Sequence, residues 1–336
     1  MSVVHPSSDG PGGTRSRRRR GEHRGERPMV PRADFRSYYG RPVLQPPSWK
    51  AYNIAGYFFL GGLAAGSSLL AVAGELTGRP LLRRAGRLAA GAAFGGSLVA
   101  LIEDLGRPSR FLNMLRVFRP TSPMSVGSWL FAAYGPLAGL AAVSEVAARD
   151  GKPDGWAVQL GTAGNVAGFG TAGLAPALAT YTAVLLADTA VPTWHEAHRE
   201  LPFVFAGSSA SSSGGLAMAM VPVAEAGPAR WFAALGTTLE LVSEIRMERR
   251  LGKAGEPLRL GRPGGLMMAA RVLGGAGALV GGVLGRRSRP AAIGAGLAMF
   301  AGSACARFGI FLAGVAASED PSFTVVPQRE RLVAGP

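Results

Sequence analysis

The sequence predicts an all-α membrane protein, a polytopic bundle of about eight transmembrane helices behind a disordered, basic N-terminal arm. Three observations support this fold class. Apolar residues make up 48% of the 336 residues, and charged residues make up only 17%. The apolar residues form continuous stretches of the roughly 20 residues that a helix needs to cross a bilayer, without the alternation of barrel strands. Glycine is also abundant, with 49 residues, as in helices that pack closely in lipid.

Residues 1–50 differ from the rest of the chain because they are rich in Arg, Gly, Pro and Ser, with four consecutive arginines at positions 17–20. Such a segment cannot bury enough apolar surface to offset the entropy lost on ordering, so we expect it to be disordered. A cleaved signal sequence would place its apolar core close behind the basic run. Here about 30 polar residues intervene, so we expect the arm to stay attached.

The first four transmembrane helices are predicted from apolar stretches near residues 53–75, 86–106, 125–148 and 160–190. Three of these stretches, and one later stretch, carry two glycines four positions apart, which lie on one helix face and let a neighbouring backbone approach. The pairs are Gly62 and Gly66, Gly91 and Gly95, Gly164 and Gly168, and Gly277 and Gly281. The fourth stretch is long for one crossing and could be tilted or broken, but we expect a single crossing there.

Four further helices are predicted near residues 201–222, 229–247, 265–285 and 290–317. The transmembrane domain therefore spans residues 51–318, and residues 319–336 form a C-terminal tail. A faint similarity between residues 61–69 and 208–216 suits a division into two four-helix halves.

The formal net charge of +15 could indicate a nucleic-acid-binding protein, but eleven of the basic residues lie in the arm. A basic arm beside a membrane is attracted to the anionic lipids of the cytoplasmic face. We therefore expect the lipid bilayer, and no nucleic acid, as the partner of this arm. Because Lys and Arg favour the cytoplasmic side of a membrane, the arm also predicts a cytoplasmic N-terminus.

Polar groups inside apolar helices are costly in lipid, so they indicate a functional site unless they pair with one another. In the eight-helix topology, those of this chain all fall in the same half of the membrane. They are Asn53, Tyr57, Glu103, Asp104, Tyr134, Tyr181, Asp188, Glu240, Glu244, Arg271 and Arg307. Their clustering predicts a polar pocket near one membrane face. The alternative is that Glu240 or Glu244 forms a structural ion pair with Arg271 or Arg307, and that Asn53 and Glu103 only lie at the interface.

The chemistry of the pocket is limited because the apolar stretches contain no histidine. Haem b inside a membrane bundle requires facing histidines, yet those of this chain lie in the arm and in one loop, at His5, His23, His195 and His198. The single cysteine, Cys305, excludes an iron–sulfur cluster bound by this chain alone. We therefore expect no intrinsic haem, iron–sulfur or metal centre. A quinone fits better, because it is apolar and needs only a few hydrogen bonds and a proton route.

Three runs of residues, 61–66, 104–111 and 122–129, resemble a known family. They are similar to the NrfD/PsrC family, the integral membrane quinone-binding subunit of polysulfide reductase and nitrite reductase systems and of related molybdenum enzymes. The resemblance spans about residue 49 to the end of the chain. Its most specific parts are Asp-Leu-Gly-Arg-Pro, which starts at Asp104, and Ser-Pro-Met-Ser, which starts at Ser122.

The resemblance implies eight helices in two four-helix halves and no prosthetic group. It also implies an exchangeable quinone, menaquinone or ubiquinone, held by a polar group of the first helix and a tyrosine of the third. The matching positions are Asn53 and Tyr134, and Tyr57 is the second choice in the first helix.

Proton transfer and partner docking complete the predicted site. Asp104 could exchange protons with a quinone oxygen, or it could hold Arg107 and Arg110 so that the loop keeps its shape for a partner. The candidate proton-transfer residues are Glu103, Asp104, Glu240 and Glu244, and the candidate buried charge pairs involve Arg271 and Arg307. The candidate docking residues are Arg107, Arg110 and Arg116.

With the resemblance, these residues predict a membrane anchor and quinone-interacting subunit of a multi-subunit oxidoreductase. It would pass electrons between the quinone pool and a ferredoxin-like iron–sulfur subunit, which connects to a molybdopterin-containing catalytic subunit. The soluble substrate would then belong to that other polypeptide. We expect the complex in the cytoplasmic (inner) membrane of a prokaryote.

Two other functions fit parts of the pattern. Buried charges and helices interrupted by glycine are also typical of an ion or solute transporter. A passive membrane anchor without quinone chemistry would need only the apolar helices. The transporter would purify alone, whereas a quinone-interacting subunit would purify with an iron–sulfur partner.

Overall fold

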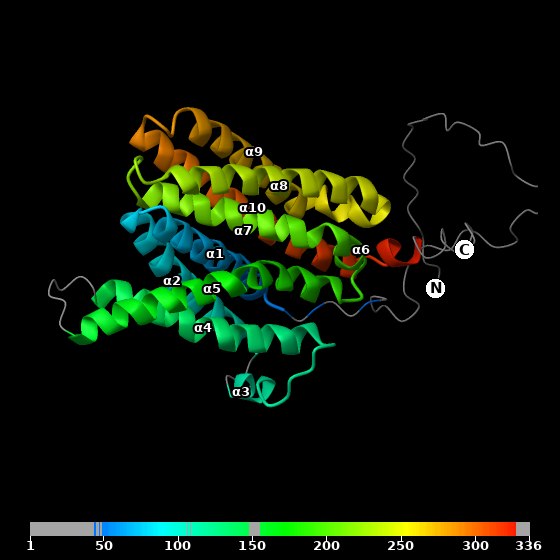
Figure 1. The fold of residues 1–336 in the computed structure, drawn as a ribbon. Coiled ribbons are helices and arrows are strands. Elements are labelled where there is room, and N and C mark those ends of the chain that lie inside the picture. The colour runs from blue at the N-terminus through cyan, green and yellow to red at the C-terminus, as the bar shows by residue number, and fades with distance from the viewer. Residues whose placement is uncertain are drawn as a thin grey trace, which may run out of the picture. The chain divides into compact units, whose positions relative to one another are not determined.

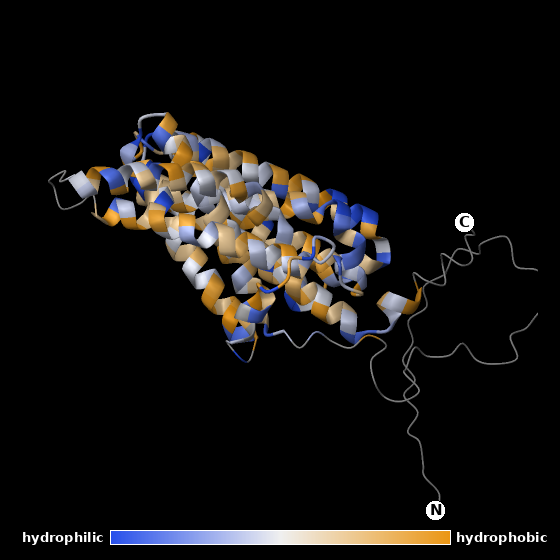
Figure 2. Cartoon of the chain, turned by 60° about the horizontal axis from the view of Figure 1, so that its bottom comes forward, coloured by the Kyte–Doolittle hydropathy of each residue, from blue (hydrophilic) through white to orange (hydrophobic). Residues whose placement is uncertain are grey.

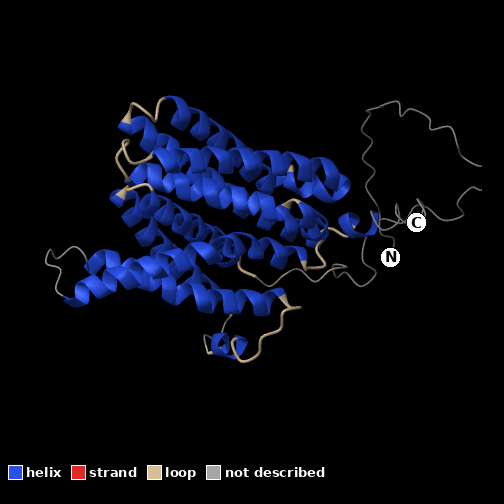
Figure 3. Cartoon of the chain, in the orientation of Figure 1, coloured by secondary structure: helices blue, strands red, loops and turns tan. Residues whose placement is uncertain are grey.

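A computed structural model describes residues 44, 47, 49–105, 107, 109–147 and 155–326. These residues belong to one compact unit, Ser37–Pro336. Within this part of the chain the structure consists of helices and loops without a strand, which confirms the all-α prediction (Figure 3). Most of the predicted arm and most of the predicted C-terminal tail lie outside the described residues.

Eight helices of 20 residues or more make up most of the described residues (Figure 1). In chain order they are α1 (Ala51–Leu76), α2 (Pro80–Asp104), α4 (Pro123–Ala147), α5 (Gly155–Ala187), α7 (Leu201–Met220), α8 (Gly227–Leu251), α9 (Gly261–Val283) and α10 (Arg289–Glu319). Shorter helical turns lie in the connections: α3 (Arg110–Met114), α6 (Pro192–Glu196), and the 3₁₀ turns η2 (Ala197–Arg199) and η3 (Gly252–Leu258).

Prolines lie where several of these helices begin. Pro80 is the first residue of α2, and a proline also occupies the first turn of α7, α8 and α10. Proline suits this place because its φ angle is already helical and its missing N–H is not needed there. α2 therefore begins before the apolar stretch at 86–106, and both Arg83 and Arg87 are helical residues.

Among the described residues, α1, α2, α4, α5, α9 and α10 are long and apolar enough to cross a membrane. They indicate an integral, multi-pass membrane protein. Hydrophobic residues cover much of the length of the helices, and strongly hydrophilic residues gather toward the helix ends (Figure 2). α7 and α8 are less hydrophobic than these six helices, because α7 is rich in serine and α8 is rich in charged residues.

The polar and apolar faces of α8 are reversed relative to a surface helix of a soluble protein. Its outer face carries exposed apolar side chains at Trp231, Leu235, Leu239 and Val242. Its inner face carries the buried carboxylates of Glu240, Glu244 and Glu248. The low hydropathy of α8 therefore comes partly from glutamates that point into the protein, and partly from the exposed Arg246, Arg249 and Arg250 near its end.

α1 lies between the other helices and contacts α2, α5, α7 and α10. Its glycines allow this close packing. A side-chain carbon on Gly62 would lie 2.5 Å from the Oγ of Ser209 on α7 and 2.8 Å from the Nη2 of Arg307 on α10. On Gly66, such a carbon would lie 2.5 Å from the backbone oxygen of Ser209. The stripe of small residues therefore brings α7 and α10 directly against α1.

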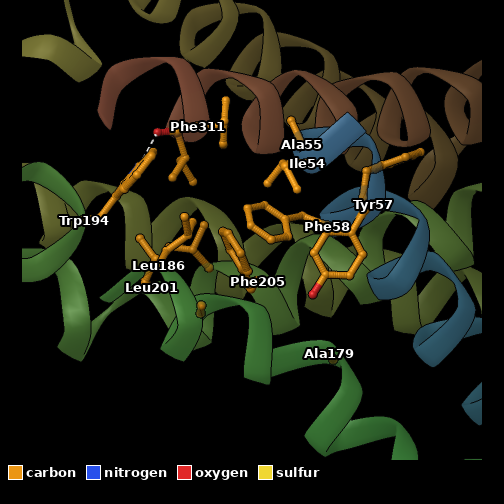
Figure 4. Packing of buried hydrophobic residues seen from close by; sticks show 14 of the residues in the cluster. Ile54, Ala55, Tyr57, Phe58, Ala179, Leu186, Trp194, Leu201, Phe205 and Phe311 are labelled. Carbon is orange, nitrogen blue, oxygen red and sulfur yellow. Dashed lines mark hydrogen bonds between the residues drawn. The ribbon is translucent and has the colours of Figure 1, made fainter. Parts of the chain in front are cut away.

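Aromatic side chains form the core between α1, α6, α7 and α10 (Figure 4). The ring of Phe58 packs against those of Phe205 and Phe311, with centroid distances of 6.2 and 6.4 Å. Trp194 packs on Phe311 at 5.6 Å, and its indole N–H donates to the carbonyl of Ile310 at 2.9 Å. This core fixes the first long helix against the last.

Candidate functional site

A cavity lies where α1 and α4 begin and where α2 and α5 end. Most of its wall is apolar, with Ile54, Phe58, Leu101, Phe131 and Leu185 among the lining residues. Its polar lining side chains are Tyr57, Asp104, Ser128 and Tyr181. These residues are far apart in sequence, and the antiparallel arrangement of the four helices brings them to the same end of the bundle.

Tyr57 reaches this cavity from the second turn of α1. The side chain is only 2% exposed, and its ring packs against Phe131 at 5.8 Å and Tyr181 at 6.5 Å. Its hydroxyl makes no hydrogen bond to any of the described residues. Because buried polar groups in proteins are nearly always hydrogen-bonded, this hydroxyl is suited to a ligand in the cavity.

Tyr181 lies over a glycine of the Ser-Pro-Met-Ser segment. A side-chain carbon on Gly127 would clash with the Tyr181 ring and lie 3.0 Å from its Cδ2 atom. Gly127 therefore leaves the space that the ring occupies, and α4 and α5 can both contribute to the lining. The neighbouring Ser128 hydroxyl donates to the backbone oxygen of Met124 at 2.9 Å.

Asp104 is the last residue of α2 and is half-buried at the cavity wall. Its Oδ1 atom accepts a hydrogen bond from the backbone N–H of Lys50 at 3.1 Å. A carboxylate can accept several hydrogen bonds, so Asp104 keeps acceptor capacity toward the cavity. It forms no ion pair with Arg107 in the described part of the chain, and the side chain of Arg110 lies outside that part.

The structure places Tyr134 away from this cavity. Tyr134 is fully buried, and its hydroxyl donates to the backbone oxygen of Ala64 at 2.8 Å and lies 2.5 Å from the Oγ of Ser68. These bonds tie α4 to the second half of α1. Asn53 is buried one turn before Tyr57 and is not among the lining residues, and Glu103 is exposed. The structure therefore brings Tyr57 and Asp104 together, but not the other predicted members.

The predicted buried charges form a second cluster between α7, α8, α9 and α10. The guanidinium of Arg271 pairs with Glu244 at 3.3 Å and also with Glu248. Arg307 instead donates to the backbone oxygen of Phe205 at 2.7 Å and to the hydroxyls of Ser208 and Ser209 at 3.2 and 3.1 Å. Its guanidinium also stacks over the Phe205 ring at 3.8 Å.

Several buried atoms of this second cluster have no hydrogen-bond partner among the described residues. They are the Oε1 atoms of Glu240 and Glu244, the Oγ of Ser303 and the Nη1 of Arg307. Glu240 is close enough to Arg307 for the two charges to attract each other. Such unpartnered polar atoms are costly in a protein interior, so this cluster is not a set of fully satisfied ion pairs.

The predicted docking residues lie beside the first cavity. Arg107 and Arg116 are exposed, and Arg110 is the first residue of α3. Met114 of α3 lines the cavity, so this loop is part of the cavity wall. Exposed aromatic rings accompany the arginines, because Phe118 packs edge-to-face on Trp129 at 6.2 Å.

A third charged cluster, at the other end of the bundle, does not follow from the sequence analysis. Glu145 of α4 accepts hydrogen bonds from Arg83 at 2.8 Å and from Arg87 at 3.0 Å. Arg87 also donates to Asn165 of α5 at 2.7 Å. The sequence signal was Pro80, because a helix that begins there adds Arg83 to the helix that already contains Arg87.

Among the described residues, no group of three or more His, Cys, Asp or Glu side chains is arranged to hold a metal ion. The family model for polysulphide reductase, NrfD, matches residues 43–229, which is more than half of the chain. The matched segment includes every residue that lines the first cavity. No curated protein matches the sequence.

Proposed function

Because this chain belongs to the polysulphide reductase NrfD family, it is a membrane subunit of a reductase complex, and we propose that it exchanges electrons between a bilayer quinone and an iron–sulfur subunit. The observation that carries the proposal is that Tyr57, whose hydroxyl has no partner among the described residues, and Asp104 line the same largely apolar cavity. The cavity lies at one end of the bundle, where a lipid-soluble ligand and a soluble partner can both reach it.

The lining residues fit a quinone. A quinone ring needs apolar walls and hydrogen-bonding groups at its two oxygens, and the cavity supplies aromatic and aliphatic walls together with two tyrosines. When bound, a quinone or quinol would supply the two-electron, two-proton chemistry of the complex. The chain itself would supply hydrogen bonds, a dry environment and a proton site.

Each polar residue has a distinct role in this proposal. The Tyr57 hydroxyl donates a hydrogen bond to a ligand oxygen, and the packing of its ring against Phe131 and Tyr181 fixes its direction. The Asp104 carboxylate holds and releases a proton at the cavity wall, where carboxylates act as general acids and bases. The backbone N–H of Lys50 holds this carboxylate in place. Tyr134 stabilises the contact between α4 and α1.

The surface around α3 would bind the iron–sulfur subunit, and this subunit would connect to a molybdopterin-containing catalytic subunit. Arg107, Arg110 and Arg116 supply positive charge, and Phe118 and Trp129 supply exposed aromatic area, a combination that is enriched in protein interfaces. A partner on this surface would lie against the loop that forms one cavity wall. This short separation suits electron transfer.

We further propose that α7 and α8 also cross the membrane, which gives eight spans in two four-helix halves. α8 turns its apolar face outward and buries its three glutamates, and its exposed arginines at positions 246, 249 and 250 lie near its end, where the membrane surface would be. α7 is buried among its neighbours, and its serines form hydrogen bonds within the protein. The protein would lie in the cytoplasmic membrane of a prokaryote with its N-terminus in the cytoplasm.

A photoreactive azidoquinone tests the binding site directly. The purified complex is irradiated with the probe, and the labelled peptides are mapped by mass spectrometry. We expect labelling of α1 near Tyr57 and of α5 near Tyr181, and we expect excess native quinone to suppress it. Labelling confined to other helices would reject the cavity as the quinone site.

Purification of the tagged chain from native membranes separates the alternatives. A quinone-interacting subunit should bring an iron–sulfur partner whose clusters are reduced when quinol is added. An ion or solute transporter should purify without such a partner. A passive anchor should bring the partner but leave its clusters oxidised in the presence of quinol.

A further inference from the structure

Three arginines converge at the end of the bundle opposite the quinone cavity. Arg79 precedes α2, Arg230 lies in the first turn of α8, and Arg286 follows α9. The guanidinium groups of Arg79 and Arg230 both approach Gly227, with Nη2 atoms 3.8 and 3.9 Å from the position of a side-chain carbon there. Arg230 and Arg286 line a common recess together with Trp231. The chain therefore brings three positive charges from three separate segments to one place.

These charges are not balanced by acidic side chains. The positive charge of Arg230 is destabilised by those of Arg79 and Arg286. Within the described residues, none of the three forms an ion pair with a carboxylate. Glu225 lies close by, but its carboxylate accepts hydrogen bonds from the backbone N–H groups of Leu81 and Leu82 at 2.8 and 3.1 Å. The cluster therefore carries an excess of positive charge that an anion would relieve.

The recess is partly pre-organised. Arg230 donates to the backbone oxygen of Val223 at 3.1 Å, which restricts its side chain. The Arg286 guanidinium stands over the Trp231 ring, 5.9 Å from the ring centroid. Arginine is suited to phosphate because its planar donor groups match two phosphate oxygens at once.

The position of the recess favours a lipid over a soluble anion as its ligand. α9 is one of the membrane-spanning helices and ends at Val283, so Arg286 lies just beyond the apolar region. Trp231 is 63% exposed, as is typical of tryptophan at a membrane interface. Leu235 and Leu239 continue the exposed apolar face of α8 from this tryptophan. A soluble phosphate would contact the arginines only, whereas a lipid would also cover this apolar face.

We propose that the recess between Arg230 and Arg286 binds the phosphate of an anionic lipid head group, and that the acyl chains of this lipid lie along the outer face of α8. The planar donor groups of arginine match the oxygens of such a phosphate, and the two arginines can bind it together. The bound lipid would neutralise the arginine cluster and hold the starts of α2 and α8 against the end of α9.

The double variant Arg230→Gln/Arg286→Gln tests this site. The control is Arg246→Gln/Arg249→Gln, which removes two exposed arginines from the other end of α8. Each complex is purified, and its bound phospholipids are measured by native mass spectrometry after addition of cardiolipin. We expect the first variant to retain roughly tenfold less cardiolipin than the wild type, because each basic residue contributes separately to binding. The control should retain as much as the wild type.

A second measurement uses the unchanged protein, so it does not depend on the folding of a variant. The thermal transition of the complex should rise with cardiolipin and not with a zwitterionic phospholipid. Equal retention by wild type and double variant, or an equal rise with both lipids, would overturn the proposal. Release of cardiolipin by millimolar inorganic phosphate would also overturn it, because the recess would then be a soluble phosphate site.

Discussion

Asp104 and Lys50 are joined by a hydrogen bond across 54 positions of sequence, with the Lys50 backbone N–H 3.1 Å from the aspartate Oδ1. This bond connects the end of α2 to the residue that precedes α1. It holds a carboxylate at the wall of the cavity that also contains the Tyr57 hydroxyl. The amide oxygen of an asparagine could accept the same hydrogen bond but could not carry the proton. A variant with asparagine therefore separates the structural role of Asp104 from its role in proton transfer.

Asp104→Asn should therefore leave the complex assembled and lower quinone-dependent turnover by roughly 10²-fold, the usual contribution of a general acid or base. The measurement is quinol-dependent reduction of the iron–sulfur partner in the purified complex. Asp104→Ala, which removes the acceptor for Lys50 as well, should also weaken the association of the loop before α1. Unchanged turnover in Asp104→Asn would contradict the proton role.

Tyr57→Phe should raise the KM for quinol by roughly fivefold, because one hydrogen bond to a ligand contributes about 1 kcal/mol. Tyr134→Phe is the matched control, since it removes the same atom from a tyrosine that bonds within the protein. The control should lower thermal stability, because the Ala64 carbonyl loses its tyrosine donor, and should leave the KM unchanged. A higher KM for quinol in Tyr134→Phe and an unchanged KM in Tyr57→Phe would instead indicate that Tyr134 binds the ligand.

Glu145→Gln should lower the free energy of unfolding by about 3 kcal/mol, because it removes the nearer and more deeply buried of the two carboxylates that pair with Arg87. Arg87 and Glu145 are each only 5% exposed. The comparison is Glu75→Gln. The Glu75 carboxylate pairs with the same arginines but is 26% exposed, so its loss should lower the free energy of unfolding by less. Thermal unfolding in detergent measures both, and equal losses would show that burial does not govern this cluster.

Glu240→Gln tests the second cluster as a proton route. The change keeps the shape of the side chain and removes its ability to carry a proton. In proteoliposomes we expect electron transfer from quinol to continue, and we expect fewer protons to move per electron. Glu248→Gln is the control, because Glu248 pairs with both Arg259 and Arg271. An unchanged proton-to-electron ratio in Glu240→Gln would leave this cluster with a structural role only.

The pH dependence of stability should include Glu200, at the start of α7. Hydrogen bonds from Arg250 lower the pKa of the Glu200 carboxyl below its usual range. Its stabilisation is therefore complete above the pKa of the unfolded chain, about 4.3, and is lost as the pH falls through the lower folded-state pKa. Glu200→Gln should remove this part of the acid-induced loss, which thermal unfolding between about pH 5 and 3 can measure. A profile identical to that of the wild type would contradict the ion pair.

Continuous apolar stretches were enough to predict an all-helical membrane protein, because a helix in lipid must satisfy its backbone internally. They were less informative at helix ends. The stretch at 86–106 missed residues 80–85, the first turn and a half of α2, where Arg83 is charged but helical. Apolar stretches also do not show which way a side chain faces. Tyr134 lies on the face of α4 that contacts α1, so its predicted ligand role does not follow from its place in the helix.

The buried charges were visible in the sequence because charge inside an apolar helix is rare, and this singled out Glu240, Glu244, Arg271 and Arg307. The partners of these charges were not visible. Arg271 reaches Glu248, which lies just beyond the predicted end of its helix, and Arg307 is held mainly by serine hydroxyls of α7. Pairing depends on the rotation of neighbouring helices, which a single sequence does not specify.

Gly62 has no side chain, and the Arg307 guanidinium occupies the space that one would need. Tyr57 lies five residues earlier on the same helix, about 7.5 Å along its axis. α1 therefore cannot slide or turn without displacing the charged end of Arg307 and the tyrosine together. The proposed quinone site and the second charged cluster therefore contact the same helix, so a change that shifts α1 would affect both.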